Sequence, residues 1–391
     1  MREGWTYKKL GEVCEILNGF AFKSGNYTDQ GIRVLRITNV QKGLIVDDDP
    51  KYYPFDEETN LKQYMLKEGD LLMSLTGNVG RVGLLQKNLL PAALNQRVAC
   101  LRIKNSNIQL EYIFHLLNSD CFERDCIFNA TGIAQKNMST EWLKKYNIPI
   151  PSLSEQQSIV AELDKINELI SLKKAQLSDL DSLAQSIFYD MFGDPIENEK
   201  GWEVKKLGDI CRKITDGTHN SPVNTETGDY MYVTAKNIKK DGIITDNITY
   251  VSSDIHNTIY ERCNPQYGDV LYIKDGVTTG IATINTIKEE FSLLSSVALL
   301  KPNDNLINYY LKAVLNFPSE YASIRGNMGG AAITRLTIVK IKTIKIPLPP
   351  LSLQQEFAKR IELIEQQKAQ ISSTIKDLET LLASRMQYWF D

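Results

Sequence analysis

A long stretch with heptad spacing occurs twice in this chain, and this repeat constrains the fold more than any other feature. The first copy spans residues 154–192, and the second spans residues 352–390, 198 residues later. In both copies apolar residues alternate in steps of four and three, which is the spacing of a coiled-coil helix. Each apolar stripe needs a partner helix, and the obvious partner of one copy is the other.

The apolar positions of the two stripes form the predicted coiled-coil seam. In chain order they are Ile159, Leu163, Ile166, Ile170, Leu177, Leu180, Ile187, Phe357, Ile361, Ile364, Ile371, Ile375, Leu378 and Leu382. Lys173 and Lys368 interrupt the pattern. A polar seam residue can fix the register of two helices, and a lysine can equally extend its ammonium to solvent. The sequence favours neither role over the other.

Both helices carry signals for their ends. Ser154 with Gln157, and Ser352 with Gln355, have the spacing of a capping box. Gly193 follows the first helix and suits a left-handed cap. A helix of about 38 residues is roughly 57 Å long. Antiparallel packing of the two copies would place one globular block at each end of a rod.

Two globular blocks repeat together with the helices. Their matched segments are short and apolar and are bounded by glycine and aspartate, which is typical of shared core strands. The matches are residues 4–14, 68–72, 98–102 and 148–151 with residues 201–211, 267–271, 297–301 and 346–349. Residues 110–118 and 305–315 are predicted to be short helices, so each block mixes helix and strand.

These observations predict an α+β fold with an internal pseudo-two-fold repeat. Two similar mixed α/β domains are separated by two long antiparallel coiled-coil helices. The predicted parts are domain one at 1–150, spacer helix one at 151–193, domain two at 199–348 and spacer helix two at 349–391. We refer to residues 1–150 as block one and to residues 199–348 as block two.

Between the matched segments the two blocks differ in sequence. Residues 18–65 align poorly with 215–265, and residues 76–97 align poorly with 275–296. Loops on a rigid scaffold usually carry recognition, so the difference favours two binding domains of different specificity. Drift after a duplication is the alternative.

The distribution of charge permits nucleic-acid binding. The chain has a net charge of −3, but residues 151–200 hold ten acidic and four basic side chains. Both blocks are mildly basic, which is a weak signal for DNA. The six cysteines form no CxxC pair, and the apolar runs are shorter than the roughly 18–20 residues of a membrane span. We therefore expect a cytoplasmic, metal-free protein without a signal peptide; Cys14 and Cys211, at equivalent positions, are predicted to be small buried hydrophobes.

Catalytic motifs are missing from the sequence. The Pro349–Pro350 pair precedes Leu351 rather than an aromatic residue, so it does not form an amino-methyltransferase loop. Residues 77–80, Gly-Asn-Val-Gly, are not a dinucleotide fingerprint. The sequence predicts a binding protein that is not an enzyme, with chemistry supplied by partners.

Motifs at the junction of block and helix are recognisable. Residues 147–157, Asn-Ile-Pro-Ile-Pro-Ser-Leu-Ser-Glu-Gln-Gln, recur at 345–355 as Lys-Ile-Pro-Leu-Pro-Pro-Leu-Ser-Leu-Gln-Gln. A glycine-containing stretch at 131–138 is matched loosely at 329–336, without its Gln-Lys-Asn. Block two also contains Ile-Thr-Asp-Gly-Thr-His at 214–219. With these motifs the sequence resembles the specificity (S) subunit of type I restriction–modification systems over essentially its whole length.

The resemblance implies a concrete function. Two target recognition domains would each bind one half of a bipartite double-stranded DNA target. The helices would set the spacer and dock two methyltransferase (M) subunits, which methylate adenine N6, and restriction/translocase (R) subunits would join them. S-adenosylmethionine, ATP and Mg would belong to the partner subunits, with no cofactor bound by this chain and no membrane partner.

Candidate DNA contacts follow from residue chemistry. Arg, Lys, Asn and Gln bind base edges, and Lys, Arg, Ser and Thr bind phosphates. The candidates are Lys23, Arg36, Asn39, Ser74, Thr76, Asn78, Arg81, Gln135, Lys136 and Asn137 in block one, and Lys213, Thr215, Thr218, His219, Lys236, Asn237, Lys274, Thr278, Arg325 and Asn327 in block two. Two other functions stay open. One is a stand-alone DNA-binding regulator or a specificity module fused to a nuclease. The other is an architectural coiled coil with protein-binding end domains.

Overall fold

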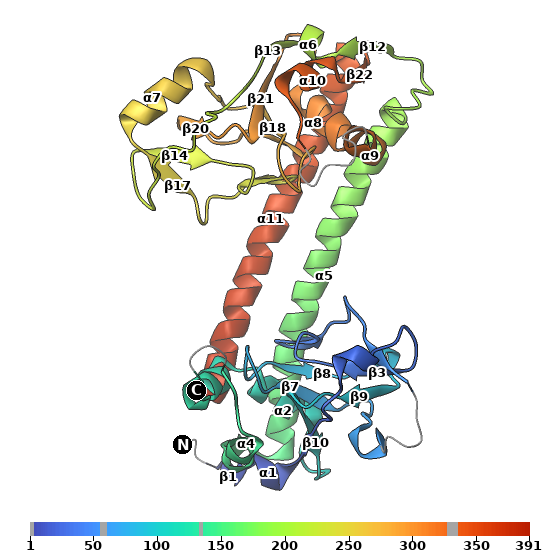
Figure 1. Ribbon diagram of the computed structural model, residues 1–391, viewed down its shortest axis with the longest axis vertical. Helices are drawn as coiled ribbons and strands as arrows, with labels where there is room; N and C mark the ends of the chain where they lie inside the picture. The colour runs from blue at the N-terminus through green and yellow to red at the C-terminus, as the bar shows by residue number, and fades with distance from the viewer. Residues whose placement is uncertain (1–3, 55–60, 133–135, 327–334) are drawn as a thin grey trace. The chain divides into compact units, whose positions relative to one another are not determined.

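The computed structural model describes residues 4–54, 61–132, 136–326 and 335–391 (Figure 1). The chain forms two compact units. Unit 1 comprises residues 1–174 and 373–391, and unit 2 comprises residues 175–372. Each unit therefore holds one block together with a part of each long helix.

Unit 1 is built on a four-stranded antiparallel sheet in the order β2-β10-β7-β8, beside a three-stranded sheet in the order β6-β3-β9. Strands β3 and β9 are parallel, and β1–β11 and β4–β5 are antiparallel pairs. The strands are β1 (Thr6–Lys9), β2 (Cys14–Asn18), β3 (Ile32–Leu35), β4 (Val40–Gln41), β5 (Leu44–Ile45), β6 (Tyr52–Tyr53), β7 (Leu71–Ser74), β8 (Val82–Leu84), β9 (Ala92–Leu94), β10 (Val98–Ile103) and β11 (Asn147–Ile150). The helices are α1 (Leu10–Val13), α2 (Leu110–Leu117), α3 (Asp120–Asn129) and α4 (Thr140–Lys145), with 3-10 turns at Ser24–Asn26, Leu61–Tyr64 and Lys87–Leu89.

Unit 2 repeats this topology. Its sheets have the orders β13-β21-β18-β19 and β17-β14-β20, with β12–β22 and β15–β16 as pairs. The strands are β12 (Glu203–Lys206), β13 (Cys211–Asp216), β14 (Tyr230–Val233), β15 (Ile238–Lys239), β16 (Gly242–Ile243), β17 (Thr249–Val251), β18 (Val270–Ile273), β19 (Ala282–Ile284), β20 (Phe291–Leu293), β21 (Val297–Pro302) and β22 (Lys345–Leu348). The helices are α6 (Leu207–Ile210), α7 (Ser253–Arg262), α8 (Asn308–Asn316), α9 (Pro318–Gly326) and α10 (Ile338–Thr343). Segments that align poorly in sequence thus keep the same order of strands.

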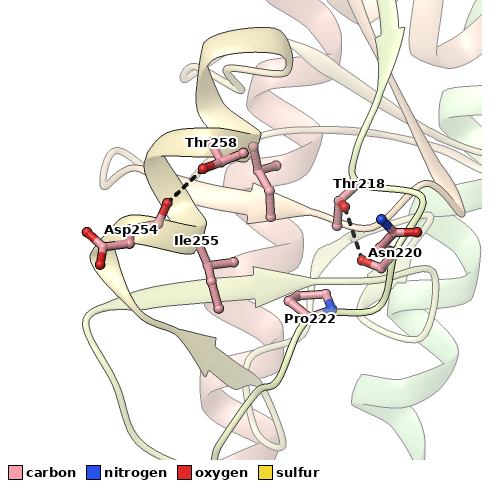
Figure 2. Close-up of a pocket in the computed structure, with 7 residues that line it drawn as sticks. Thr218, Asn220, Pro222, Asp254, Ile255 and Thr258 are labelled. Atoms are coloured by element: carbon pink, nitrogen blue, oxygen red, sulfur yellow. Dashed lines mark hydrogen bonds between the residues drawn. The ribbon is translucent and has the colours of Figure 1, made fainter.

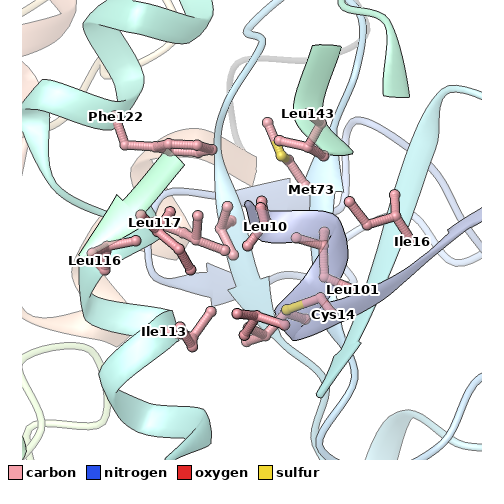
Figure 3. Packing of buried hydrophobic residues seen from close by; sticks show 14 of the residues in the cluster. Leu10, Cys14, Ile16, Met73, Leu101, Ile113, Leu116, Leu117, Phe122 and Leu143 are labelled. Carbon is pink, nitrogen blue, oxygen red and sulfur yellow. The ribbon is translucent and has the colours of Figure 1, made fainter. Parts of the chain in front are cut away.

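The four-stranded sheet of each unit is buried on both faces. Successive side chains of a strand point to opposite faces, so Leu71 and Met73 of β7 join the core shown in Figure 3, while Leu72 joins a second core. The first core also contains Ile159 and Leu163 of α5 (Leu153–Phe192). The block and the helix therefore fold around one shared core.

The two long helices, α5 and α11 (Leu351–Phe390), each have 40 residues and pack antiparallel within each unit. In unit 1, Trp389 Nε1 donates to Glu162 Oε2 at 2.9 Å, and Lys174 Nζ lies 2.9 Å from Glu379 Oε1. Later residues of α5 therefore meet earlier residues of α11. In unit 2, the Phe192 and Phe357 rings are 5.3 Å apart, which continues the same order. The predicted fold class is confirmed.

The residues of the predicted seam are all buried or half-buried. At the end of α5 the buried face shifts by one position, because Phe188 and Phe192 are almost fully buried while Ile187 and Met191 are half-buried. Lys368 of α11 is 12% exposed, and its Nζ pairs with Asp181 of α5 at 2.6 Å. The same Nζ lies 2.5 Å from Asp241 Oδ1 in the β15–β16 turn.

The predicted capping boxes are wrong in position. Helix α5 begins at Leu153, and Ser152 Oγ accepts from the Glu155 amide at 3.3 Å, so Ser152 caps the helix. Helix α11 begins at Leu351, where the Pro350 carbonyl accepts the first turn's amides. The prolines start each helix earlier than the serines Ser154 and Ser352, since proline suits the position just before or at the first turn.

The cysteine prediction is confirmed. Cys14 and Cys211 are buried, and desolvation raises the pKa of each thiol to about 12. Within the described ranges, no group of three or more His, Cys, Asp or Glu side chains could hold a metal ion. Over the same residues, no helix is long and apolar enough to cross a membrane.

Candidate nucleic-acid interface

The β7–β8 hairpin of block one brings several candidate residues together. The chain after α3 returns alongside this hairpin, where Gly77 N donates to Lys136 O at 2.9 Å and Met138 N donates to Leu75 O at 2.8 Å. Thr76 and Asn137 form a β-bridge. Asn78, Lys136 and Asn137 are exposed, so the hairpin and this returning segment form one polar surface.

The buried hydroxyl of Ser74 and the half-buried side chain of Arg81 hold this hairpin in shape. Ser74 is almost fully buried, and its Oγ donates to the carbonyl of Asn78 and accepts from Arg81 N at 3.2 Å. Arg81 Nη1 donates to Gln41 Oε1 at 2.6 Å. Ser74 therefore shapes the hairpin that presents Asn78.

The remaining block-one candidates flank strand β3. Lys23 is exposed, while Arg36 Nη2 donates to the Asp49 carbonyl at 2.8 Å and pairs with its carboxylate at 3.4 Å. Gln135 lies outside the described residues, as does Asn327 of block two. Lys23 and Arg36 therefore lie in loop segments before and after β3 and not on the β7–β8 hairpin.

Asn39 and Asn237 occupy equivalent positions and hold equivalent loops. Asn39 accepts from Arg36 N at 2.9 Å and donates to Val46 O at 2.8 Å. Asn237 likewise accepts from the Thr234 amide at 3.0 Å and donates to a carbonyl across its loop at 3.2 Å. Both ends of each amide are used in the loop, so a base contact by either residue would require breaking these bonds.

Block two contains a cavity of about 510 Å³ lined mainly by polar side chains (Figure 1 locates its strands, β13 and β18). Three candidates, Thr215, His219 and Lys274, line it together. The other lining residues are Ile214, Asp216, Arg262, Arg335, Thr337 and Ile338. Arg262 and Arg335 were missed as candidates from the sequence, because block one has no arginine at the position of Arg335 and residues 215–265 do not align.

The Asp216 carboxylate is the centre of this cavity. Its Oδ2 lies 3.3 Å from Lys274 Nζ, and its Oδ1 lies 3.3 Å from His219 Nε2 and 3.4 Å from Arg262 Nη1. Asp216 is 4% exposed and Lys274 is 2% exposed. A buried charge requires a close partner, and the Asp216 carboxylate and the Lys274 ammonium are partners of opposite sign.

The remaining block-two candidates are dispersed. Lys213 Nζ donates to Asn264 Oδ1 at 2.8 Å, and Thr218 Oγ1 donates to the Asn220 carbonyl at 3.0 Å. Arg325 Nη1 donates to the carbonyls of Val277 and Thr279, which fixes the β18–β19 loop. Two further candidates, Lys236 and Thr278, are exposed on loops.

A second cavity of block two has a volume of about 320 Å³. It is lined in part by Thr218 and Asn220, the neighbours of His219 in the sequence. Figure 2 shows Thr218, Asn220 and Pro222 of one loop facing Asp254, Ile255 and Thr258 of α7. In unit 1, the described residues at the place of α7 begin at Leu61 and form the 3-10 turn Leu61–Tyr64. The two blocks therefore differ in sequence around this cavity.

Two repeated glutamines escaped the sequence predictions. Gln156 and Gln354 are almost fully buried, each one turn into its long helix. Gln156 accepts from Gln109 N at 2.9 Å and donates to Pro151 O at 3.0 Å, and Gln354 makes the same pair of bonds with Ile307 N and a proline carbonyl. The repeat of a Gln-Gln pair after each proline segment was the available signal. These side chains join each long helix to the start of α2 or α8.

Comparison with known proteins identifies the family. The family described as "Type I restriction modification DNA specificity domain" matches residues 2–181 and 199–380. The chain therefore belongs to this family, and the resemblance found in the sequence is confirmed.

Named relatives include specificity subunits of type I restriction enzymes. The MjaVIII subunit of Methanocaldococcus jannaschii is 30% identical over 189 residues, which cover 47% of this chain and 44% of that protein. The EcoAI subunit of Escherichia coli is also 30% identical, over 42% of this chain and 28% of that protein. The chain thus spans less than half the length of these two relatives. The putative MjaX subunit is 22% identical over 97% of this chain and 93% of that protein.

Solved structures share the fold. The S subunit from M. genitalium has a TM-score of 0.56 at 15% identity, covering 99% of this chain and 96% of that chain. A chain from a study of assembly and conformational transition in the type I R-M system has a TM-score of 0.59 at 20% identity, covering 100% and 98%. The two-block, two-helix fold is therefore that of specificity subunits.

Proposed function

We propose that this chain gives a type I restriction–modification complex its DNA sequence specificity, with each block binding one half of a bipartite double-stranded target. The observation that carries the proposal is the pair of blocks, which share one strand order but differ at their loops and cavities. Variable loops on a constant scaffold are how one fold binds different sequences. The chain itself contributes recognition, and methylation and cleavage belong to its partners.

The polar surfaces of the blocks support DNA as the ligand. Block one gathers Asn78, Lys136 and Asn137 on one exposed surface, and block two gathers Arg262, Lys274 and Arg335 around one cavity. Amide and cationic side chains bind base edges and phosphates. The twenty candidate residues remain predictions until contacts are measured.

The long helices support a second role, the docking of methyltransferase subunits. Leu183 of α5 and Leu381 of α11 occupy equivalent positions in the repeat, and they are 48% and 45% exposed. Exposed apolar residues on a helix are favourable contacts for a protein partner. Because the repeat presents the same residue type twice, it fits two copies of one partner, and R subunits would join through them.

Sequencing of N6-methylated adenines tests the proposed function. Cells with the gene should methylate one bipartite motif, and cells without it should lose methylation of that motif alone. An unchanged methylation pattern would contradict the proposal and would favour a stand-alone regulator or an architectural protein. Co-purification of an adenine methyltransferase with the full chain, at two copies per chain, is the independent check on the partner.

The helices are also proposed to set the unread spacer between the half-sites. Inserting seven residues, about two helical turns, into both helices after Ala175 and before Ser373 should lengthen the spacer and keep both half-sites. The methylated motif gives the result directly. Altered half-sites would show that the helices do more than space the two blocks.

A further inference from the structure

Four charged residues around the Asp216 cavity distinguish block two from block one. The two blocks pair equivalently here, since Thr76 bridges Asn137 in block one and Asp275 bridges Arg335 in block two. In the same alignment, Asn18 of block one corresponds to Asp216 and Leu75 corresponds to Lys274. Block one is therefore uncharged at all four positions that hold Asp216, Lys274, Asp275 and Arg335 in block two.

The cavity carries an excess of positive charge. Its Arg and Lys side chains are Arg262, Lys274 and Arg335, and its carboxylates are Asp216 and the adjoining Asp275. Three cations and two carboxylates leave one positive charge when His219 is neutral. A single phosphodiester has one negative charge and would balance this excess, whereas the neutral edge of a base would leave it unbalanced.

Inner and outer charges of the cavity have different access to solvent. The side chains of His219, Arg262 and Arg335 are 54%, 51% and 56% exposed. Asp216 and Lys274 are buried beneath them. A guanidinium has five N–H donors in a planar fork, and Arg262 uses donors on the Asp216 carboxylate and the Gly217 carbonyl. Asp216 thus orients Arg262, and Asp275 orients Arg335 at 3.4 Å, so that an incoming ligand can reach both guanidinium groups.

We propose that this cavity holds one backbone phosphate of the DNA half-site bound by block two. Arg262 and Arg335 donate to the phosphate oxygens, and Asp216 and Lys274 are positioning residues that fix Arg262. The inference rests on the proposed function, because it takes DNA as the ligand. It adds a phosphate anchor at positions that are uncharged in block one, so the two blocks would hold their half-sites by different sets of charges.

The test measures binding of the full chain, with its methyltransferase partner, to the duplex identified by methylation sequencing. In a series of duplexes, one phosphate of the block-two half-site at a time becomes an uncharged methylphosphonate. The wild-type protein should lose about tenfold in affinity at one position. Arg262→Gln and Arg335→Gln should each weaken binding to the unmodified duplex. For these variants, the methylphosphonate at the sensitive position should cause little further loss of affinity. Each should also make the slope of log K against log salt shallower, by up to about 0.9.

Lys288→Gln is the matched control, because it removes one positive charge from an exposed loop of block two outside the cavity. It should keep the methylphosphonate profile of the wild type. The proposal is overturned if Arg262→Gln and Arg335→Gln also keep that profile, or if they relax the preference for one base pair instead, which would mean that the cavity binds a base edge. If the wild type fails to prefer its motif over a scrambled duplex, the proposed function itself fails.

Discussion

The two blocks share one backbone plan but place different charges inside it. Block one has Asn18 and Leu75 where block two has the buried Asp216–Lys274 pair. On the next helix, the buried Phe122 of α3 corresponds to the buried Glu320 of α9. Strand pairing depends on main-chain hydrogen bonds. The side chains of paired strands can therefore change from apolar to charged while the pairing stays the same. The Asp216–Lys274 pair shows that this fold tolerates new buried charge when a partner accompanies it.

A buried ion pair that both blocks keep gives the largest expected effect. Asp269 pairs with Lys301 at 2.5 Å with both side chains buried, whereas Asp70 pairs with Arg102, whose side chain is 26% exposed. Asp269→Ala removes the carboxylate partner of the buried Lys301 ammonium. It should lower the free energy of unfolding of unit 2 by about 3–5 kcal/mol. Asp70→Ala should cost unit 1 roughly 1–3 kcal/mol, because solvent reaches the guanidinium. Hydrogen exchange of strand peptides in each unit measures both losses, and equal losses would contradict this comparison.

The Glu320 carboxyl should make unit 2 sensitive to pH. Burial, with a smaller contribution from the charge of Asp194, raises its pKa from 4.5 to about 7. The folded state then holds the proton more tightly than the unfolded chain does. Its stabilising contribution is therefore full below pH 4.5 and is lost as the pH rises through 7, by about 3 kcal/mol.

Glu320→Gln should remove this dependence and raise the stability of unit 2 at pH 8. Unit 1, with Phe122 at the equivalent position, should be unaffected by the substitution at any pH. Urea unfolding at pH 5 and pH 8, followed by hydrogen exchange in each unit, makes the measurement. A wild-type unit 2 that is equally stable at both values would exclude a buried, titrating Glu320.

The repeated glutamines should have equal effects in the two units. Gln156→Leu and Gln354→Leu each leave buried backbone groups without their partners, at a cost of about 1–3 kcal/mol. The neighbours Gln157 and Gln355 are exposed, so leucine there should change stability by less than about 0.5 kcal/mol. Thermal unfolding of the four variants separates the two outcomes. A loss in only one of the two buried variants would show that the joint between helix and block is not a shared device.

The smallest expected effect comes from the seam. Lys368→Ile gives α11 the residue type that α5 has at the equivalent position, Ile170. The substitution removes the ion pairs of Lys368 with Asp181 and Asp241, whose side chains are 58% and 66% exposed. Such pairs contribute about 0–1 kcal/mol each, and the added apolar burial offsets part of the loss. A loss above about 2 kcal/mol in unit 2 would show that Lys368 fixes the packing of the helices.

Much of the fold could be predicted because the same sequence patterns occur in both halves of the chain. The heptad pattern predicted both long helices, and the structure ends α5 at Phe192, just before the predicted cap Gly193 with its left-handed φ of 78°. The helix starts were displaced because proline and a single serine, rather than the predicted capping boxes, begin the first turn. Periodicity locates a helix more firmly than its ends.

The interface could be predicted only in part. Ser74, Thr76 and Lys136 were selected by residue type, and the hairpin contacts that assemble them depend on the chain returning after α3. Arg262 escaped selection because it lies on α7, in a segment that does not align with block one in sequence. Long-range pairing decides which polar residues meet, and residue type alone does not contain that information.

The central claim is that each block binds its own half-site independently of the other block. The most direct test of this claim is an exchange of block two. Residues 199–348 are replaced by the second block of another specificity subunit, and methylated adenines are sequenced in cells that carry the hybrid. We predict a motif that keeps the half-site of block one and the spacer length and acquires a new second half-site. A motif changed in both halves, or in neither, would contradict this account.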